Sequence, residues 1–338
     1  MKKSTIGGQA VIEGVMMRSP HHMALAVRRD DGEIVVETKR ITPLADKNKA
    51  YGAPLVRGAV NMGSMLVQGV KILNRSIELA GIAEEEPSRF EKWLAKHTKR
   101  DIMDIMMVVA VAMAAVLAIG LFVFLPSLAA RGFQTFIRSS LWVNVLEGVT
   151  RLLIVGGYLA AISRMKDIQR VLAYHGAEHK VVNCYENDLD LTIENARAQS
   201  VQHPRCGTSF LFIVVIVSVV IFSLFGAITN LWLRMLTRIL LLPLVAGVSY
   251  EVLRGLSASD SKLAGFFRRP GMWFQKMTAK EPDDKMLEVA LASFKAVMDA
   301  DERMQRAHEE KEASDAQEAC PDLESFEPAE PEIKSVET

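Results

Sequence analysis

The sequence predicts a mainly α-helical, polytopic membrane protein with a small β-element at its N-terminus. Half of its 338 residues are hydrophobic, and they are gathered into blocks rather than spread along the chain. A helix needs roughly 20 apolar residues to cross a bilayer. Four blocks come near that length, at 103–125, 141–162, 209–231 and 236–253. We therefore expect about four transmembrane helices, separated by polar segments.

The first segment, 1–50, is predicted to be a small β-rich cytoplasmic element. Met23, Leu25 and Val27 alternate with other residues, as in a strand with one buried face. The dipeptide Asp31-Gly32 is typical of a tight turn, and an apolar run follows it. These two signals together predict a hairpin.

A run dense in glycine, 7–18, precedes this hairpin. Its glycines either shape turns and bulges or let the backbone approach a ligand or another segment closely. The adjacent His21 and His22 would point to opposite faces of a strand. We therefore expect these two histidines at the surface rather than in a metal site.

The next segment, 51–101, is predicted to contain an amphipathic helix and a charged linker. Pro54 suits the first turn of a helix, which we expect to run to about residue 80. Its polar residues are spaced alternately four and three apart and form one stripe: Arg57, Asn61, Ser64, Gln68, Lys71 and Arg75. Such a helix fits the membrane interface or the side of a helix bundle. Residues 84–101 are the expected linker into the bilayer.

The membrane segments are predicted to be 102–162 and 209–254, with two helices each. Pro126 marks the expected loop between the first two helices, and the second is expected to continue beyond the membrane. That second helix carries Glu147 and Arg151 one turn apart. Because a lone charge is costly in hydrocarbon, we expect these two side chains to pair inside the bundle. A pair that only fixes helix packing and a functional polar core both fit.

The last predicted helix contains two notable residues. Pro243 predicts a kink. Glu251, near the end of the helix, either reaches a functional site or pairs with Arg254 at the membrane surface, and we favour the pair.

The distribution of basic residues predicts the orientation in the membrane. Seventeen Lys and Arg residues precede the first block, six lie in 163–207 and twelve follow the last block, against two in 126–139 and two in 231–238. Cytoplasmic loops are enriched in Lys and Arg. Both termini and the segment 163–208 are therefore expected in the cytoplasm, in a multi-pass protein of the inner or plasma membrane.

The remaining segments and the composition narrow the class of protein. Residues 255–306 are predicted to be a cytoplasmic amphipathic helical segment, and 307–338 a disordered acidic tail. The three cysteines, at 184, 206 and 320, make no even disulfide framework and indicate a reducing compartment. A formal net charge of zero argues against a nucleic-acid partner.

The cytoplasmic loop between the second and third blocks is predicted to hold a metal site. His175, Glu178 and His179 would leave one face of a helix. Two imidazoles one turn apart can hold an ion, and a carboxylate beside them can take a proton from water. His203-x-x-Cys206 adds a second pair with ligand-like spacing. We therefore predict a divalent metal, zinc, bound by His175, His179, His203 and Cys206, with Glu178 as the catalytic base.

The sequence leaves the function of this site open. Cys184 and Glu194 are further candidate ligands, and Gly176 weakens the helix that the motif needs. Four protein ligands would make a closed structural site, whereas a position left to water would make a catalytic one. The first function is a metal-dependent hydrolase acting on a peptide or lipid-linked substrate at the membrane. The alternative is a non-catalytic assembly factor or transporter-like protein, with membrane lipid and other membrane proteins as partners.

Four blocks of the sequence resemble hallmark blocks of the YqhQ-like family of bacterial membrane proteins. They are 7–18, 174–180, 203–210 and 246–251. The resemblance runs from residue 4 to about 295 and omits the acidic tail. It implies a shared architecture in the bacterial inner membrane and a metal site, since the family is described as predicted metal-dependent enzymes. It supplies no established reaction.

Overall fold

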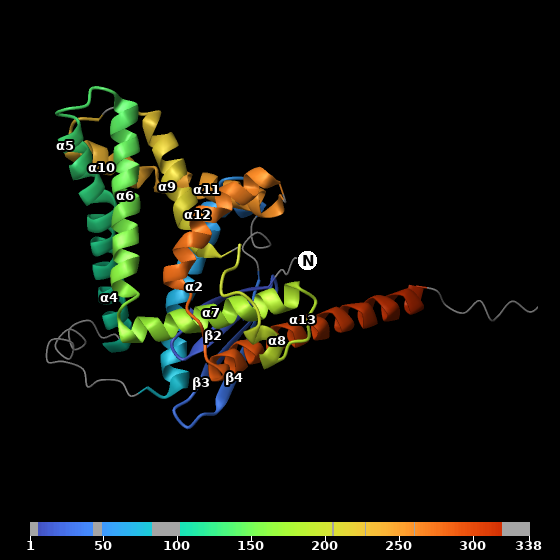
Figure 1. Ribbon diagram of the computed structural model, residues 1–338. Helices are drawn as coiled ribbons and strands as arrows, with labels where there is room; N and C mark the ends of the chain where they lie inside the picture. The colour runs from blue at the N-terminus through green and yellow to red at the C-terminus, as the bar shows by residue number, and fades with distance from the viewer. Residues whose placement is uncertain are drawn as a thin grey trace, which may run out of the picture.

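The computed structural model describes residues 6–42, 49–82, 102–204, 206–226, 228–259 and 261–319. The protein is mainly helical and has one small antiparallel sheet near its N-terminus, as the sequence predicted. Figure 1 shows two parts: the sheet with two long helices crossing it, and an upright group of apolar helices.

The sheet is a meander in the order β1-β2-β3-β4, in which each strand pairs antiparallel with the next. The strands are β1 (Gly7–Val11), β2 (Gly14–Arg18), β3 (His22–Arg28) and β4 (Ile34–Arg40). The turn between β3 and β4 contains the predicted Asp31-Gly32. Gly32 has a φ of 90°, a conformation that glycine adopts without strain. The predicted hairpin is therefore confirmed.

Both faces of the sheet are covered, so the alternating side chains form two cores. Helices α7 (Lys166–Glu186) and α13 (Asp284–Ala319) cover the face that carries Val15 and Ala26. The C-terminal half of α2 (Val56–Ala80), which follows the 3-10 turn η1 (Lys49–Gly52), covers the face that carries Leu25 and Val27. We call β1–β4, α7, α13 and the short α8 (Ile193–Arg197) the α/β unit. The segments predicted as separate cytoplasmic pieces thus contribute to one folded unit.

His22, which was expected at the surface, is buried. It lies against α13, where its Nδ1 is 2.7 Å from a carboxylate oxygen of Asp301. The prediction failed because the strand pattern does not reveal that a helix from the far end of the chain covers this face of the sheet.

Among the described residues, two apolar helices are long enough to cross a membrane, Val108–Phe133 and Ser140–Ile162. The first consists of α4 (Ile102–Ile119), the π-helical turn η2 (Gly120–Phe124) and α5 (Leu125–Phe133), and the second is α6 (Ser140–Ile162). Pro126 does not end the first helix, contrary to the prediction. It lies in the first turn of α5, directly after the π turn, where its missing N–H is tolerated.

The rest of the apolar sequence forms shorter helices. These are α9 (Gly207–Ser223), α10 (Leu231–Leu240) and α11 (Leu242–Ala258). Helices α10 and α11 are bent by 47° just before Pro243, so the predicted kink is confirmed. Counting this bent pair as one span, the described residues contain up to three candidate spans, fewer than the four predicted. We call α4, α5, α6, α9 and α10 the helical pillar.

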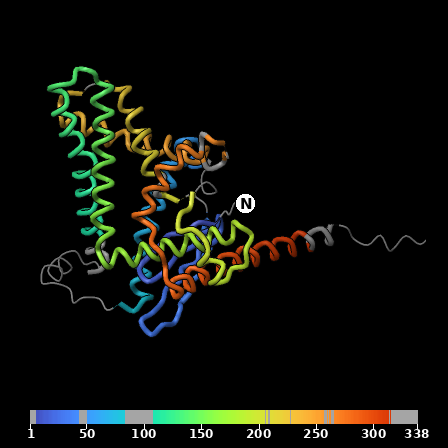
Figure 2. Tube along the Cα trace, viewed as in Figure 1, coloured from blue at the N-terminus to red at the C-terminus, as the bar shows by residue number. Residues whose placement is uncertain are grey.

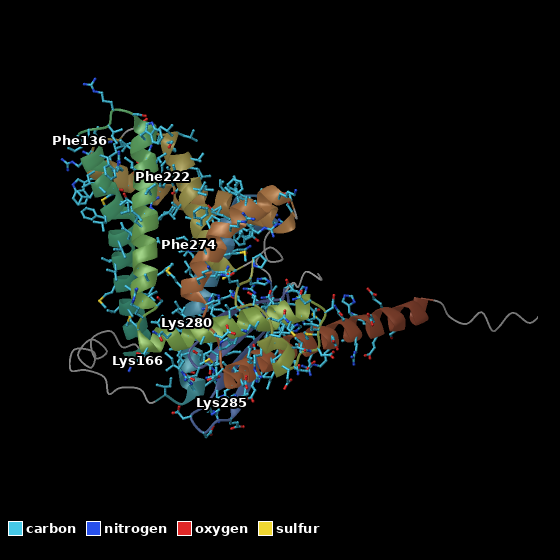
Figure 3. The ribbon with its side chains drawn as sticks, viewed as in Figure 1. Phe136, Lys166, Phe222, Phe274, Lys280 and Lys285 are labelled. Atoms are coloured by element: carbon cyan, nitrogen blue, oxygen red, sulfur yellow. The ribbon has the colours of Figure 1, made fainter. Side chains whose placement is uncertain are left out.

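The sequence had suggested that α6 continues into α7, but the two helices are separate. Helix α6 ends at Ile162, Met165 is extended, and α7 leaves at a steep angle to the pillar (Figure 1). The Nζ of Lys280, in the segment after α12 (Lys262–Thr278), donates a hydrogen bond to the Ser163 carbonyl at 3.1 Å. Figure 3 shows Lys166 and Lys280 near this junction and Phe136 at the opposite end of the pillar.

The polar stripe of α2 contacts other parts of the protein. Arg57 forms a bidentate pair with Glu251 of α11, at 2.5 and 2.6 Å. Glu251 therefore pairs mainly with α2. The favoured prediction had been a pair with Arg254. On the other side of α2, Met65 and Leu66 are 64% and 66% exposed. In the first half of α2, the apolar side is thus the one left uncovered.

Helix α13 is longer than the amphipathic helix predicted near its start. It continues to Ala319, so residues 307–319 are helical where the disordered tail was expected. Figure 2 shows this end of α13 extending well beyond the sheet. The rest of the predicted tail, including Cys320, and the predicted linker 84–101 lie outside the described residues.

Candidate metal centre

The His-x-x-Glu-His motif lies on α7, which is continuous through Gly176. A Cβ at Gly176 would be only 1.8 Å from the carbonyl oxygen of Lys280. The glycine is therefore needed because the segment after α12 crosses α7 here in close contact. The helix forms despite the low propensity of glycine, since tertiary packing supplies the stability.

Side chains of α7 hold the loop that carries the second ligand pair. Lys180 Nζ donates to the carbonyls of Arg197 and Gln199, both at 2.8 Å. The Asn183 amide donates to the carbonyls of Ser200 and Gln202, at 2.8 and 3.1 Å. These four bonds fix the path of the loop toward His203 and Cys206.

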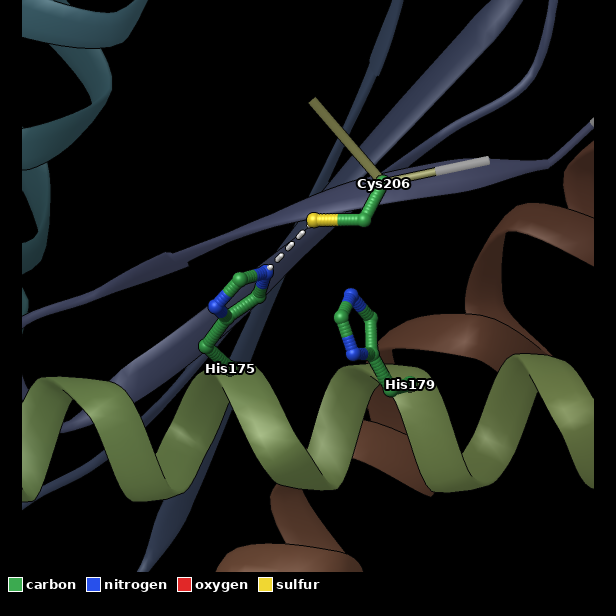
Figure 4. A group of neighbouring side chains, drawn as sticks. All are labelled: His175, His179 and Cys206. Carbon is green, nitrogen blue, oxygen red and sulfur yellow. Dashed lines mark hydrogen bonds between the residues drawn. The ribbon is translucent and has the colours of Figure 1, made fainter. Parts of the chain in front are cut away.

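Three of the predicted ligands come together. The candidate ligand atoms of His175, His179 and Cys206 lie within 4.8 Å of one another, and His175 Nε2 is 3.4 Å from Cys206 Sγ (Figure 4). The two imidazole rings have centroids 4.3 Å apart.

Backbone carbonyls orient both imidazoles. The Nδ1 of His175 is 2.7 Å from the Thr278 carbonyl, and the Nδ1 of His179 is 2.5 Å from the Val201 carbonyl. A hydrogen bond at Nδ1 places the proton there and leaves Nε2 available to a metal ion, an arrangement common among metal-bound histidines. When neutral, both rings are therefore in the tautomer that a ligand needs.

The donor set fits zinc. Zinc is bound by thiolate and imidazole at about 2.3 and 2.0–2.1 Å, so two ligand atoms on one tetrahedral ion lie roughly 3.3–3.8 Å apart. The 3.4 Å between His175 and Cys206 falls in that range, and the spread of up to 4.8 Å needs only a small contraction. Two imidazoles and one thiolate make three protein ligands.

The residues themselves favour the ionised thiol. Burial alone would raise the pKa of the Cys206 thiol, but hydrogen bonds from His175 and His179 outweigh it and lower this pKa to about 4. Burial alone would likewise lower the pKa of His175, but the Cys206 thiolate and the Glu178 carboxylate raise it to about 9. A thiolate is the form in which cysteine binds a metal ion.

Glu178 lies beside these ligands, where β1 meets α7. Its Oε1 accepts a hydrogen bond from the Gly8 amide at 2.9 Å. A Cβ at Gly8 would be 2.9 Å from the Glu178 Cγ and 2.7 Å from the Met16 carbonyl. The glycine-dense run of the sequence therefore provides a close approach of the backbone to another segment, one of the two interpretations considered above.

His203, the fourth predicted ligand, is not part of the three-residue cluster. Its Nε2 is 3.3 Å from a carboxylate oxygen of Glu186, and its ring centroid is 5.8 Å from that of His179. Gln275 makes two hydrogen bonds of 2.9 Å to the His203 backbone. Burial and the neighbouring His179 lower the pKa of His203 to about 4, so the ring is neutral at pH 7.

The two further candidate ligands lie elsewhere. Cys184 is fully buried, and its Sγ is 3.4 Å from the Asp190 carbonyl. Glu194 is exposed on α8. Neither belongs to the metal-ligand cluster.

The cluster opens into a cavity of about 840 Å³, which we call the site cavity. Glu178 and His203 also line it. One wall is apolar and comes from α2, chiefly Met62, Met65 and Leu66. A few polar side chains also line the cavity: Gln9, Arg18, Asn61, Gln68 and Tyr250.

Sequence reasoning missed the residues that support the cluster. Gln275 and the carbonyls of Thr278 and Val201 lie far from the motif in sequence or act through the backbone, so no local pattern reports them. Glu186 could have been found, because it follows His179 by seven residues, which is two helical turns on the same face.

Comparisons with known proteins identify relatives of most of the chain. The family model described as "Protein of unknown function (DUF1385)" matches residues 53–300. The chain is 35% identical over 298 residues to the "Uncharacterized protein YqhQ" of Bacillus subtilis (strain 168), covering 86% of this chain and 92% of that protein. No solved structure matches significantly.

Proposed function

The chain belongs to the DUF1385 family of proteins of unknown function, and on that premise we propose that it is a membrane-bound zinc-dependent hydrolase. The observation that carries the proposal is the position of the cluster. Three ligand residues lie on the wall of a large cavity, and a carboxylate lies beside them. Catalytic zinc sites keep three protein ligands and leave a fourth position to water or substrate.

Each residue of the cluster has a role in this proposal. His175, His179 and Cys206 hold the ion, which when bound supplies a Lewis acid and lowers the pKa of water. Glu178 accepts the proton of the attacking water and passes it to the leaving group. The Gly8 amide holds one Glu178 oxygen and so fixes the carboxylate against β1.

The site cavity supports a lipid-linked substrate with an anionic group. Its α2 wall is apolar, and the exposed Met65 and Leu66 continue that surface outward. Arg18 lines the cavity and donates to Gln68, but it has no carboxylate partner among the described residues. An arginine with an unpaired charge matches a carboxylate or phosphate of the substrate.

The membrane placement is part of the same proposal. We place α4–α5 and α6 across the inner membrane, with α9 and the bent pair α10–α11 entering the membrane and returning to the same side. The α/β unit and both termini then lie in the cytoplasm. Support comes from the lysine-bearing junction at one end of the pillar and the 89% exposed Phe136 at the other (Figure 3).

A structural zinc site in an assembly factor or transporter-like protein is the competing function. It is favoured by His203, which is buried and lines the same cavity. If the His203 ring left Glu186, it would give a fourth ligand and a closed shell. The hydrogen bond to Glu186 and the two bonds between Gln275 and the His203 backbone oppose that movement.

The test is hydrolysis by the purified full chain in lipid nanodiscs. Zinc-loaded protein should release product from a mixture of anionic lipid-linked esters and amides, and His175→Ala should abolish both zinc binding and product. Glu194→Gln, an exposed site on α8, is the matched control and should behave as wild type. Stoichiometric zinc with no turnover of any such substrate would favour the structural function.

A further inference from the structure

A second polar cluster lies in the helical pillar, away from the metal centre. Glu147 of α6 is contacted by Arg151 of the same helix and by Arg234 and Arg238 of α10, at 3.2–3.3 Å. The guanidinium of Arg238 lies 4.0 Å from the ring centroid of Phe222. Figure 3 shows Phe222 in the part of the pillar remote from the α/β unit.

The cluster revises the sequence prediction for these residues. The pair of Glu147 with Arg151 is confirmed, but Arg234 and Arg238 had been assigned to a short loop. They lie on α10, and each is 1% exposed. The sequence did not reveal this, because two arginines in ten residues resemble a polar connection more than a buried helix.

The cluster holds more positive than negative charge. Three arginines face one carboxylate, and Glu147 is the one acidic residue within α5, α6, α9 and α10. Arginine keeps its proton even when buried. Because a buried charge without a counter-charge is costly, two positive charges remain to be neutralised.

Two of the three arginines in the cluster have N–H donors without an acceptor. Arg151 bonds to the Phe122 carbonyl, the Ser218 hydroxyl and Glu147. In contrast, Arg234 Nη2 and Arg238 Nη1 are buried without a partner in the described part of the chain. Both guanidiniums hold Glu147 Oε2 with their other terminal nitrogen. The free donors therefore belong to one place in the pillar.

We propose that Arg234 and Arg238 bind a phosphate-type oxyanion. Arginine forks match the geometry of phosphate oxygens, and charge-assisted bonds of this kind are strong. Phosphate carries one to two negative charges near neutral pH and so balances the excess of the cluster. The phosphate belongs either to a membrane phospholipid or to free inorganic phosphate. This site is independent of the metal centre.

The first experiment measures free phosphate. The full chain is purified in detergent, stripped of lipid, and its unfolding temperature is followed as inorganic phosphate rises, with ionic strength held constant by gluconate. Wild type should show a saturable increase. Arg234→Gln and Arg238→Gln should bind phosphate roughly tenfold or more weakly. Arg131→Gln, an exposed arginine of α5, is the matched control and should titrate as wild type.

The second experiment measures lipid phosphate. Native mass spectrometry of protein extracted directly from membranes should show one retained phospholipid in wild type and Arg131→Gln, and less in both α10 variants. Binding in this arm alone identifies a lipid ligand, and binding in the first alone identifies free phosphate. No phosphate-dependent shift together with equal lipid retention in all variants would overturn the proposal.

Glu147→Gln keeps the test decisive if the arginine variants fail to fold. It removes the built-in counter-charge and leaves both donors in place. An anion site predicts a larger stabilisation by phosphate or a higher retention of phospholipid than in wild type. A purely internal ion network predicts a lower unfolding temperature with neither change.

Discussion

At the scale of single residues, the candidate metal centre brings together two imidazoles of one helix and a thiol of another segment. His175 and His179 are one turn apart, and the sequence placed both correctly on one face of α7. Cys206 joins them from another segment, as predicted. His203 does not, because Glu186 and Gln275 hold it aside. Neither of these supporting contacts has a local sequence signal.

Glu178→Gln should separate catalysis from metal binding. The amide keeps the size of the side chain and can still accept the Gly8 hydrogen bond, but it cannot take a proton. Zinc content should stay at the wild-type level, while the rate of hydrolysis falls by about 10²-fold or more. Zinc content by atomic emission and turnover on the same preparation measure both. Loss of zinc in this variant would make Glu178 a ligand or a support for one.

Cys206 should be protected from alkylation only while zinc is bound. In native membranes a maleimide should leave Cys206 unmodified, and a chelator should make it reactive, because His175 and His179 lower the pKa of this thiol. Cys184, which is fully buried, should stay unmodified in both conditions. Peptide mass spectrometry distinguishes the two sites. Equal protection of Cys206 with and without metal would show that burial alone shields it.

Arg18→Gln should weaken binding of an anionic substrate. Arg18 contributes a charge to the site cavity, so its loss should raise KM by roughly tenfold or more with little change in kcat. Arg18→Lys should recover part of the effect, since it restores the charge without the fork. The matched control is a neutral analogue of the same substrate, whose KM should not respond to either variant. An equal rise for both substrates would place Arg18 in the structure of the cavity instead.

Whole elements were predicted by type better than by orientation. The α2 helix was expected from its polar stripe, yet that stripe contacts Glu251 and Arg18 while apolar residues stay exposed. Periodicity defines two sides of a helix but does not say which one meets the protein. Pro126 was expected to end a helix, and a π-helical turn before it absorbs the break instead.

Gly176→Ala should destabilise the contact between α7 and the segment after α12. The added methyl would collide with the Lys280 backbone, which cannot move as a flexible side chain can. We expect a loss of about 2 kcal/mol or more, together with weaker zinc binding, since Thr278, whose carbonyl orients His175, directly precedes that segment. Gly63→Ala, on an exposed position of α2 with open space around it, is the control and should be neutral or stabilising. Urea unfolding of both variants measures the difference.

At the scale of the whole molecule, the sequence predicted helices and a small sheet but not how they meet. The α/β unit combines the strands within residues 7–40, helices α7 and α8, and the helix that begins at Asp284. Hydrophobic periodicity is a local property and carries no information on such long-range contacts. Span number was overestimated for a related reason: composition alone does not show that the last two apolar blocks are shortened at α9 and bent before Pro243.

Reporter fusions test the proposed orientation. A fusion after Phe133, between α5 and α6, and one after Asp190, beyond α7, should report opposite sides of the membrane. The physical basis is the excess of Lys and Arg on the side of the α/β unit. An alkaline phosphatase and a fluorescent protein fused at each position give paired readouts. The same side for both positions would rule out α6 as a span.

The coordination of zinc tests the central claim most directly. Zinc K-edge X-ray absorption of the purified full chain should give two imidazole nitrogens, one sulfur and one exchangeable oxygen, and His203→Ala should leave that spectrum unchanged. The contrary result is a shell of three imidazoles and one sulfur, with no exchangeable oxygen, that loses one imidazole in His203→Ala. That result would show a closed structural site and contradict the catalytic one.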